Sequence, residues 1–469
     1  MCRTRSPMTF DGELAGGKDM NIHWIQEQLD QAGALRNFTK WNYELRRTEN
    51  LQHIMQRAFQ VASAEPTGTV YVMLPREVLM ERMDGMPAIS AARHSAPTTP
   101  QADPEALQEV AEALVKAQHP LIITGYSGRN QSTVEAMVRL AEAVGAPVAS
   151  DPIHLCFPSN HPMYAGRYGQ SYVQEADAIL IVDQDVPYIP AQGKPRPEAR
   201  IIQIDIDPIK ESIPLGVFPT DQIIHADSSK AVPALVDAVE ALITPADQAR
   251  IDERFQLIKD RHEQQRRDAK EVALSHNQRS PITPQWLSYC IGEAIDEDTI
   301  LIDECVTNGG NVDTYIPRDK PGTLYRSGRS SLGWGLGGAM GTKLARPEST
   351  VVAVVGDGSF IYGHPTSTLW AADVHNAPFL TVIYNNQVHN AAKQSLIIRG
   401  YPDGASVRQN RFIGVELGPS VDYALLAQSC RAYGEKVENP SEVPAALERA
   451  LEQVRGGRPA VLDVRIEQP

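Results

Sequence analysis

The residues best suited to chemistry stand at the ends of two apolar runs in the last third of the chain. The tetrapeptide Gly-Asp-Gly-Ser at 356–359 directly follows the run 351–355, and Asn385-Asn386 directly follows the run 379–384. Short runs with this β-branched, apolar composition predict two buried parallel strands. Because open α/β sheets bind ligands at the carboxyl ends of their strands, both motifs are expected at one ligand-binding edge.

The oxygen atoms in these motifs suit a hard divalent cation. The Asp357 carboxylate and the Asn386 side-chain amide, together with main-chain carbonyl groups, are ligands that suit Mg2+, which commonly holds substrate phosphates as well. Gly356 and Gly358 would let the backbone approach a diphosphate, and the helix expected after Ser359 offers it free N–H groups. The alternative is that Asp-Gly and Asn-Asn are only turn residues. Their joint occurrence at strand ends favours a cofactor site.

The pairing of Gly-Asp-Gly with Asn-Asn resembles the signature of the thiamine diphosphate (ThDP) enzymes. The segment between the two motifs looks most like the acetolactate-synthase-like branch of that family. The resemblance implies that Asp357 and Asn386 supply side-chain ligands to Mg2+ and that Val388 supplies its main-chain oxygen. It also implies that Ser359 and the Gly358 amide contact the diphosphate.

A glycine-rich segment precedes the first motif. Residues 331–341 read Ser-Leu-Gly-Trp-Gly-Leu-Gly-Gly-Ala-Met-Gly. So many helix-weakening residues argue against a plain helix, and close approach of a ligand or of another backbone is the expected reason. By resemblance, Leu332 falls where the family places one bulky apolar side chain that holds ThDP in a V shape. The alternative is that Leu332 is an ordinary core residue.

Polar residues also follow a third expected strand, at 299–302. The family uses polar residues at this strand end, so Thr307 and Asn308 are candidates for binding the diphosphate. Their alternative role is to cap the loop. Cys305 is expected to be a small buried residue and not a nucleophile, since no neighbour in the sequence would activate it.

Three further side chains are candidates for the substrate side of the site. His389, which stands next to Asn390 just past the second motif, is expected to face the substrate pocket, with a structural histidine as the alternative. Gln26 and Lys40 correspond by motif match to residues that line the active-site entrance in acetolactate-synthase-like enzymes. The alternative for both is a surface polar residue.

Two linker-like stretches, at 86–102 and 244–280, divide the chain into segments of about 1–85, 103–245 and 280–469. Apolar β runs alternate with amphipathic helices, which predicts an α/β fold with doubly wound parallel sheets. By resemblance, the segments are a partial pyrimidine-binding domain, a central Rossmann-like domain, and a domain that binds the diphosphate and Mg2+. The resemblance is strongest over the last segment.

The first segment resembles only the second half of its domain. The half expected before it would carry the glutamate that hydrogen-bonds the pyrimidine ring of ThDP, and no residue of this sequence is assigned that role. Either a misplaced gene start or a genuine shortening would explain the difference. Because a few family members manage without this glutamate, enzyme activity is left open.

The central segment resembles a domain that holds FAD in acetolactate synthases and no cofactor in several relatives. Here the glycines Gly125 and Gly128 follow an expected strand but lack the full Gly-x-Gly-x-x-Gly spacing of a dinucleotide site. A structural spacer is therefore favoured over an FAD site.

The resemblance implies ThDP- and Mg2+-dependent decarboxylation or carboligation of a small 2-oxo acid. In this family the active site forms across a dimer interface, so a homodimer or homotetramer is expected. Two other hypotheses stay open. One is a non-catalytic ThDP-binding subunit that partners a full-length relative, and the other is a binding module whose central domain holds an adenine nucleotide.

Composition argues against several other classes. A net charge of −14 and a pI near 5.4, without a basic cluster, argue against a nucleic-acid partner. No apolar run reaches the roughly 18 residues of a membrane span, and the N-terminus resembles no secretory signal. The five scattered cysteines indicate reduced thiols, so a cytoplasmic location is expected.

Overall fold

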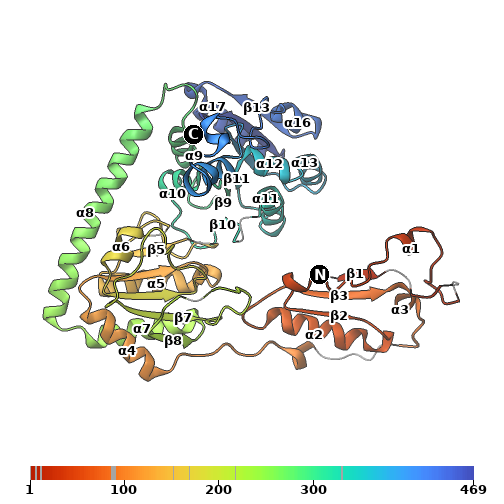
Figure 1. Cartoon of the computed structure of the whole chain (residues 1–469), viewed down its shortest axis with the longest axis horizontal. Helices are drawn as coiled ribbons and strands as arrows, with labels where there is room; N and C mark the ends of the chain where they lie inside the picture. Colours follow the sequence, from red (N-terminus) through yellow and green to blue (C-terminus); the bar gives the residue numbers. More distant parts are fainter. Residues whose placement is uncertain are drawn as a thin grey trace. The chain divides into compact units, whose positions relative to one another are not determined.

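The structure is a computed structural model that describes residues 2–5, 8–10, 13–85, 91–151, 153–167, 169–216, 218–328 and 331–468. Residues 86–90 of the first expected linker therefore lie outside the described residues. The chain forms two compact units, Met1–Gln101 and Ala102–Pro469 (Figure 1). The described strands form three sheets in which every strand pair is parallel, which confirms the predicted α/β class with parallel sheets.

The first unit contains a three-stranded sheet in the order β1-β3-β2. Its strands are β1 (Cys2–Arg5), β2 (Trp41–Glu44) and β3 (Val70–Pro75). Helix α2 (Leu51–Ser63) packs Ala58 against Val70 and Val72. The short helices of this unit are α1 (Ile22–Ile25) and α3 (Arg76–Met80).

The second unit begins with a five-stranded sheet in the order β5-β4-β6-β7-β8. These strands are β4 (Pro120–Thr124), β5 (Val148–Ser150), β6 (Ala178–Val182), β7 (Arg200–Asp205) and β8 (Gln222–His225). One face packs on α4 (Pro104–Lys116), α5 (Ser132–Val144) and α7 (Ser228–Leu242), seen beside this sheet in Figure 1. A second apolar cluster, which includes Val173 and Ala176, covers the other face. Because both faces are buried, the strands are apolar throughout.

Charged side chains pair with one another at the carboxyl edge of this central sheet. Asp183, directly after β6, is fully buried and forms hydrogen bonds with Arg129 and Ser228. Asp205, at the end of β7, accepts the Tyr126 hydroxyl at 2.6 Å and pairs with the Lys210 ammonium at 2.8 Å. At the edge where open α/β sheets bind ligands, Asp183 and Asp205 are thus engaged in ion pairs within the protein.

Helix α8 (Pro245–Ser275) follows the central sheet and begins with a capping box formed by Thr244 and Asp247. Arg254 on this helix donates to the carbonyl oxygens of Gly145 at 2.9 Å and Ala117 at 3.1 Å, next to the C-terminal ends of α5 and α4. This satisfies carbonyl groups that the ends of helices leave free. Although α8 is long, it is strongly polar, and no helix in the described residues has the length and apolar character to cross a membrane.

The last sheet has six parallel strands in the order β10-β9-β11-β12-β14-β13. They are β9 (Ile300–Glu304), β10 (Leu324–Arg326), β11 (Val351–Gly356), β12 (Leu380–Asn385), β13 (Tyr433–Val437) and β14 (Ala460–Arg465). The strands expected at 351–355 and 379–384 are confirmed, and they pair directly, with Val352 opposite Leu380.

Helices cover both faces of this last sheet, which makes it doubly wound. One face packs on α9 (Pro284–Ala294), α10 (Gly309–Tyr315) and α17 (Val443–Arg455). The other packs on α11 (Trp334–Ala345), α12 (Asp357–Tyr362), α13 (Pro365–Val374) and α16 (Tyr423–Ser429). The elements α14 (Asn390–Gln394) and α15 (Ala405–Arg408) lie in the connection between β12 and α16.

The expectation that glycines exclude a plain helix at 331–341 is wrong, because α11 begins at Trp334 within that segment. Helix propensity is a weak preference, and burial of Leu336 and Ala339 against the sheet overrides it here. The expected cause of the glycines is present, however. A Cβ on Gly333, where φ is 95°, would lie 2.4 Å from the Tyr362 carbonyl oxygen, and one on Gly335 would lie 2.7 Å from a Glu304 carboxylate oxygen.

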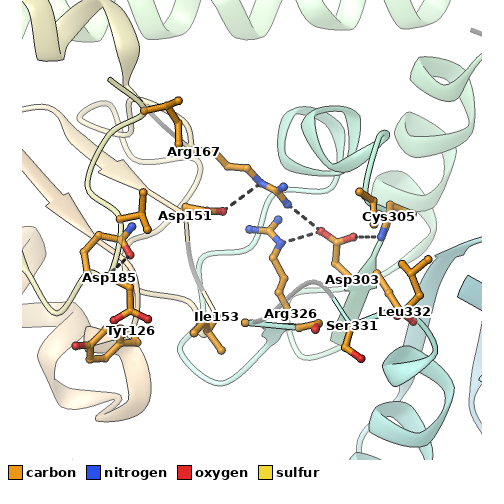
Figure 2. A pocket seen from close by; sticks show the side chains of 17 residues that line it. Tyr126, Asp151, Ile153, Arg167, Asp185, Asp303, Cys305, Arg326, Ser331 and Leu332 are labelled. Carbon is orange, nitrogen blue, oxygen red and sulfur yellow. Dashed lines mark hydrogen bonds and ion pairs between the residues drawn. The ribbon is translucent and has the colours of Figure 1, made fainter. Parts of the chain in front are cut away.

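A buried ion-pair cluster joins the loop after β5 to the last sheet. Arg167 and Arg326 both point at Asp303, with nitrogen–oxygen distances of 3.3 and 2.8 Å (Figure 2). Both arginines also pair with Asp313, Arg167 at 2.6 Å. Burial alone would lower the pKa of Arg326, but the Asp313 and Asp303 carboxylates outweigh it and raise that pKa. The cluster therefore holds the end of β9 by charge.

Replacing Arg326 by alanine should lower the free energy of unfolding of the second unit by about 3 to 5 kcal/mol, because it strips buried carboxylates of a paired charge. Chemical denaturation followed by circular dichroism would measure the loss. The control, Arg279→Ala, removes an exposed ion pair with Glu467 and should cost under about 1 kcal/mol. Equally small losses in both variants would contradict this account of the cluster.

Candidate functional site

A cavity of 480 Å3 lies at the carboxyl ends of β9, β11 and β12. The strand order reverses here, because β10 pairs on one side of β9 while the chain continues with β11 on the other. Such a reversal is where open α/β sheets bind ligands. All of the site residues predicted in the last segment line this cavity: Thr307, Asn308, Leu332, Gly356, Asp357, Gly358, Ser359, Asn386, Val388 and His389.

Asp357 supplies the one carboxylate of this cavity's wall and is only 3% exposed. One of its oxygens accepts the N–H of Gly358 at 2.8 Å and the other accepts the N–H of Gln387 at 2.6 Å. Burial raises the pKa of this carboxyl, although both N–H groups and the more distant His389 and Arg465 act in the opposite direction. In the described part of the chain, no basic side chain forms an ion pair with it.

The turn after β12 brings two more oxygen atoms to the same place. Gln387 adopts a left-handed conformation with φ of 57°, and its N–H bond to Asp357 fixes the turn. The buried Asn386 side-chain oxygen accepts the N–H of Val388 at 3.0 Å, and the Val388 carbonyl accepts the N–H of Asn390 at 2.8 Å. Each of these oxygens has a second lone pair, so both can accept another ligand.

Together these oxygens could hold a hard divalent cation. Among the described residues, no group of three or more His, Cys, Asp or Glu side chains could hold a metal ion. A cation here would therefore depend on one carboxylate, one amide and one main-chain oxygen. That donor set suits Mg2+, which commonly completes its octahedral shell with water and phosphate oxygens.

His389 and its neighbours form the wall next to these oxygens. Its ring lies against Gly358, where a Cβ would come within 2.6 Å of the imidazole, so position 358 leaves no room for a side chain. The ring also stacks on Tyr362 with ring centroids 6.0 Å apart. Asn390 is 9% exposed and its side-chain oxygen has no hydrogen-bond partner, so it is available to a ligand. Sequence reasoning named His389 and Asn390 but missed Tyr362.

The residues expected near a diphosphate come from two strand ends. The hydroxyl of Ser359 is buried and donates only a long hydrogen bond, 3.4 Å, to the Glu304 carbonyl. Thr307 is exposed, and Asn308 stands at the N-cap position of α10 without forming a side-chain cap. The Asn308 side-chain oxygen accepts a long hydrogen bond, 3.4 Å, from the Asn311 side chain, so the loop-capping alternative stays open at Asn308. All three side chains keep hydrogen-bonding capacity toward the cavity.

Leu332 also lines the cavity and is 39% exposed, so it is not an ordinary core residue. Leu332 also lines a second cavity of 430 Å3, whose lining side chains are drawn in Figure 2 with Leu332 labelled. Cys305 and Val306 belong to both walls as well. Burial, with help from Asp303 and Glu304, raises the pKa of the Cys305 thiol well above its usual value, which suits a packing residue and not a nucleophile.

Glu304 is the residue near the site that sequence reasoning did not single out. It ends β9, is 5% exposed, and its carboxylate accepts the N–H groups of Gly333, Trp334 and Gly335 at 2.6, 3.1 and 2.7 Å. It thereby caps α11 from a different strand. Its only signals in the sequence are its place at a strand end and the glycines that make room for it.

Gln26 and Lys40 belong to the first unit. Gln26 is exposed and ends the short helix α1. Lys40 is exposed, and its ammonium donates to the carbonyl oxygens of Ala64 at 2.6 Å and Pro66 at 2.9 Å, which is a structural use of the side chain. The placement of both residues at an active-site entrance stays a prediction.

Comparison with known proteins agrees with this geometry. Residues 307–464 match the family described as "Thiamine pyrophosphate enzyme, C-terminal TPP binding domain", and residues 107–235 match "Thiamine pyrophosphate enzyme, central domain". Thiamine pyrophosphate is another name for ThDP. The first match includes every predicted site residue of the cavity, Thr307 to His389.

Individual relatives have the same character. The chain is 25% identical to acetolactate synthase isozyme 3 large subunit of Escherichia coli over 460 residues, which covers 94% of this chain and 76% of the relative. It is 26% identical to sulfoacetaldehyde acetyltransferase of Rhodobacter capsulatus over 490 residues, covering 99% and 80%.

A solved structure with the same fold is benzoylformate decarboxylase from Polynucleobacter necessarius. It superposes with a TM-score of 0.73 at 21% identity, over 96% of this chain and 81% of that one. With both family matches, the parallel sheets and a site built at the expected strand ends, the chain belongs to the thiamine diphosphate-dependent enzyme family, in its acetolactate-synthase-like branch.

Proposed function

We propose that this chain uses ThDP and Mg2+ to decarboxylate a small 2-oxo acid or to join the resulting unit to a second carbonyl compound. The observation that carries the proposal is the convergence of Asp357, Asn386 and Val388 with the diphosphate candidates in one cavity. The relatives described above, an acetolactate synthase, an acetyltransferase and a benzoylformate decarboxylase, support this reaction class.

Mg2+ would be held by the carboxylate of Asp357, the side-chain oxygen of Asn386 and the carbonyl of Val388. The fit of these residues to a cation rests on charge. The Asp357 carboxylate is buried, its pKa is raised by burial, and within the described part of the chain its hydrogen-bond partners are two N–H groups. A buried carboxylate without a counter-charge is costly, and a divalent cation would remove that cost.

The remaining cavity residues would bind and shape ThDP. The Gly358 N–H, Ser359, Thr307 and Asn308 would contact the diphosphate, and Leu332 would support the V-shaped cofactor from below. ThDP, when bound, supplies a carbon centre that attacks the carbonyl of a 2-oxo acid and accepts the electrons released with CO2. His389 would face the reacting carbon and hold or move a proton there, and Gln26 and Lys40 would line the entrance.

A non-catalytic ThDP-binding subunit is the alternative function. Such a subunit would use the same cavity, with Asp357, Asn386 and Val388 holding Mg2+. Both functions require the same ThDP and Mg2+ binding, so turnover and not binding separates them. Pyruvate, a small 2-oxo acid, is the first substrate to assay.

We propose a spacer role for the central sheet in preference to FAD binding. At its ligand-binding edge, Asp183 and Asp205 are engaged in the Arg129–Asp183 and Lys210–Asp205 pairs, beside the cavity of 430 Å3. A nucleotide that used either carboxylate would have to separate a buried ion pair, which is costly. A colourless purified protein would agree with this role, whereas a yellow protein that releases a flavin on denaturation would contradict it.

We also propose a homodimer or homotetramer in the cytoplasm. Helices α11, α12, α13 and α16 pack side by side and leave a group of large apolar side chains exposed by 43 to 60%. This apolar face consists of Leu344, Ile361, Tyr362, Trp370, Val374 and Leu425. A second copy of the chain would cover it, and Tyr362 also lines the ThDP cavity. Cys156, Cys290, Cys305 and Cys430 are buried free thiols, which agrees with a reducing compartment.

Isothermal titration of ThDP into the purified chain should give binding with Mg2+ and none with EDTA. Asp357→Ala should abolish the Mg2+-dependent binding while circular dichroism shows an intact fold, because the mutation removes the only carboxylate of the donor set. Asp298→Ala, a surface variant, should bind as the parent does. Unchanged binding in Asp357→Ala would refute the assigned metal site.

Leu332→Ala should lower pyruvate turnover by about tenfold or more while ThDP affinity changes little, because this side chain shapes the cofactor and does not anchor its phosphates. Steady-state kinetics combined with the same titration separates the two effects. The control is Leu215→Ala. Leu215 lies in the connection between β7 and β8 and is 89% exposed. A parallel loss of affinity and turnover would argue against the shaping role.

Trp370→Glu should convert the assembly to monomers, because a charge at the centre of the apolar face cannot be buried against a second copy. Sedimentation velocity would measure the mass. Leu257→Glu, at an exposed leucine of α8 outside the apolar face, should leave the assembly intact. If Trp370→Glu sediments like the parent protein, the interface lies elsewhere.

A further inference from the structure

Glu304 is placed where one side chain can fix the geometry of the cofactor-shaping loop. Helix α11 starts with N-cap residue Gly333 and has no side-chain cap of its own. The first N–H groups of a helix have no partner within the helix and need one from outside. Three of them, on Gly333, Trp334 and Gly335, are satisfied by the two oxygens of the Glu304 carboxylate.

The chemistry of these contacts requires a carboxylate. One Glu304 oxygen accepts two N–H groups and the other accepts the third. A glutamine amide offers one acceptor oxygen and one donor NH2 group, so it must face at least one N–H donor with another donor. The negative charge also interacts favourably with the positive end of the helix. Glycine at 335 leaves the space that the carboxylate fills, since a Cβ there would lie 2.7 Å from it.

The residue held most tightly is the neighbour of Leu332. Gly333 is fixed on one side by its 2.6 Å hydrogen bond to Glu304 and on the other by the close carbonyl of Tyr362. Leu332, directly before it, lies in the walls of both cavities. The Glu304 main-chain carbonyl, in turn, accepts the hydroxyl of Ser359 at 3.4 Å. Glu304 therefore connects the loop of Leu332 to the strand ends that carry the phosphate candidates.

We propose that Glu304 is a positioning residue. By holding the first turn of α11 against the end of β9, it fixes the position of Leu332 in the wall of the ThDP cavity. Glu304 lines the adjoining cavity of 430 Å3 and not the ThDP cavity, and Leu332 lines both, so in this proposal Glu304 acts through Leu332. The inference rests on the proposed ThDP-dependent function. Its consequence is that loss of the carboxylate affects the reactivity of bound ThDP more than its affinity.

The first test uses Glu304→Gln in the full-length protein. Hydrogen–deuterium exchange of the cofactor-free protein should show faster exchange at the amides of Gly333 to Gly335, with the amides of β11 unchanged. With ThDP and Mg2+ added, the dissociation constant should stay within about threefold. Exchange of the C2 proton of bound ThDP with solvent deuterium should slow by about tenfold or more, since small displacements near the reacting centre have effects of this size or larger.

A glycine pair on the same helix tests the contact from its other side. Gly335→Ala pushes a methyl group into the Glu304 carboxylate and should reproduce the phenotype of Glu304→Gln without changing any charge. Gly337→Ala adds a methyl group where nothing lies within 4 Å and should behave as the parent protein. This pair decides the matter even if Glu304→Gln fails to fold.

A second control separates positioning from a general loss of stability. Asp227 is also a buried carboxylate at a helix N-terminus, on α7 of the central sheet. Asp227→Asn should lower the thermal unfolding midpoint but leave C2 proton exchange unchanged.

Two results would overturn the inference. One is unchanged amide exchange at 333–335 in both Glu304→Gln and Gly335→Ala, and the other is a loss of ThDP affinity as large as the loss of C2 exchange. Failure of the proposed function looks different, because the parent protein itself would then bind no ThDP. In that event the amide exchange alone decides whether Glu304 holds the loop.

Discussion

The structure around the site depends on how three buried carboxylates at one sheet edge are neutralised. Asp303 and Glu304 end β9, and Asp357 follows β11, the next strand in the sheet. Each is at most 5% exposed, so each needs a compensating group close by. Asp303 is paired with two arginines, and Glu304 is surrounded by three N–H groups of a helix. Asp357 accepts two N–H groups, and among the residues that the structure describes it forms no ion pair with a basic side chain, which leaves its charge for a ligand.

The same constraint accounts for the unusual composition of α11. A helix must bring its N-terminus close enough to Glu304 for three short hydrogen bonds, and a side chain at 335 would occupy that space. Glycine costs about 1 kcal/mol per position relative to alanine in a helix interior. The buried capping interaction and the packing of Leu336 against the sheet offset this cost. Gly333 and Gly335 are therefore explained by close contacts within the protein.

Much of this site could be predicted from sequence because its signals are local. The apolar runs before Asp357 and Asn386 fix two strands, and parallel pairing then brings their carboxyl ends to one edge. The sequence could not reveal that Arg167 reaches Asp303 across more than a hundred residues, or that Glu304 caps a helix that starts thirty positions later. Such contacts depend on tertiary packing and leave no periodic pattern. Gln26 and Lys40 are assigned to the active-site entrance by resemblance alone, and both belong to the first unit.

Stability and function make different demands on these three carboxylates. Asp303 is paired with two arginines and Glu304 accepts three N–H groups, although burial still raises the pKa of the Glu304 carboxyl, and both side chains hold the edge of the cavity in place. Burial disfavours the charged form of Asp357 and so raises the pKa of its carboxyl. Protonation would relieve this unfavourable environment. A group whose pKa is raised by burial in a cavity wall is characteristic of a functional position. Asp303 and Glu304 are thus held by arginines and by helix N–H groups and frame the cavity, whereas Asp357, at the end of β11, is the carboxylate that a bound cation would stabilise.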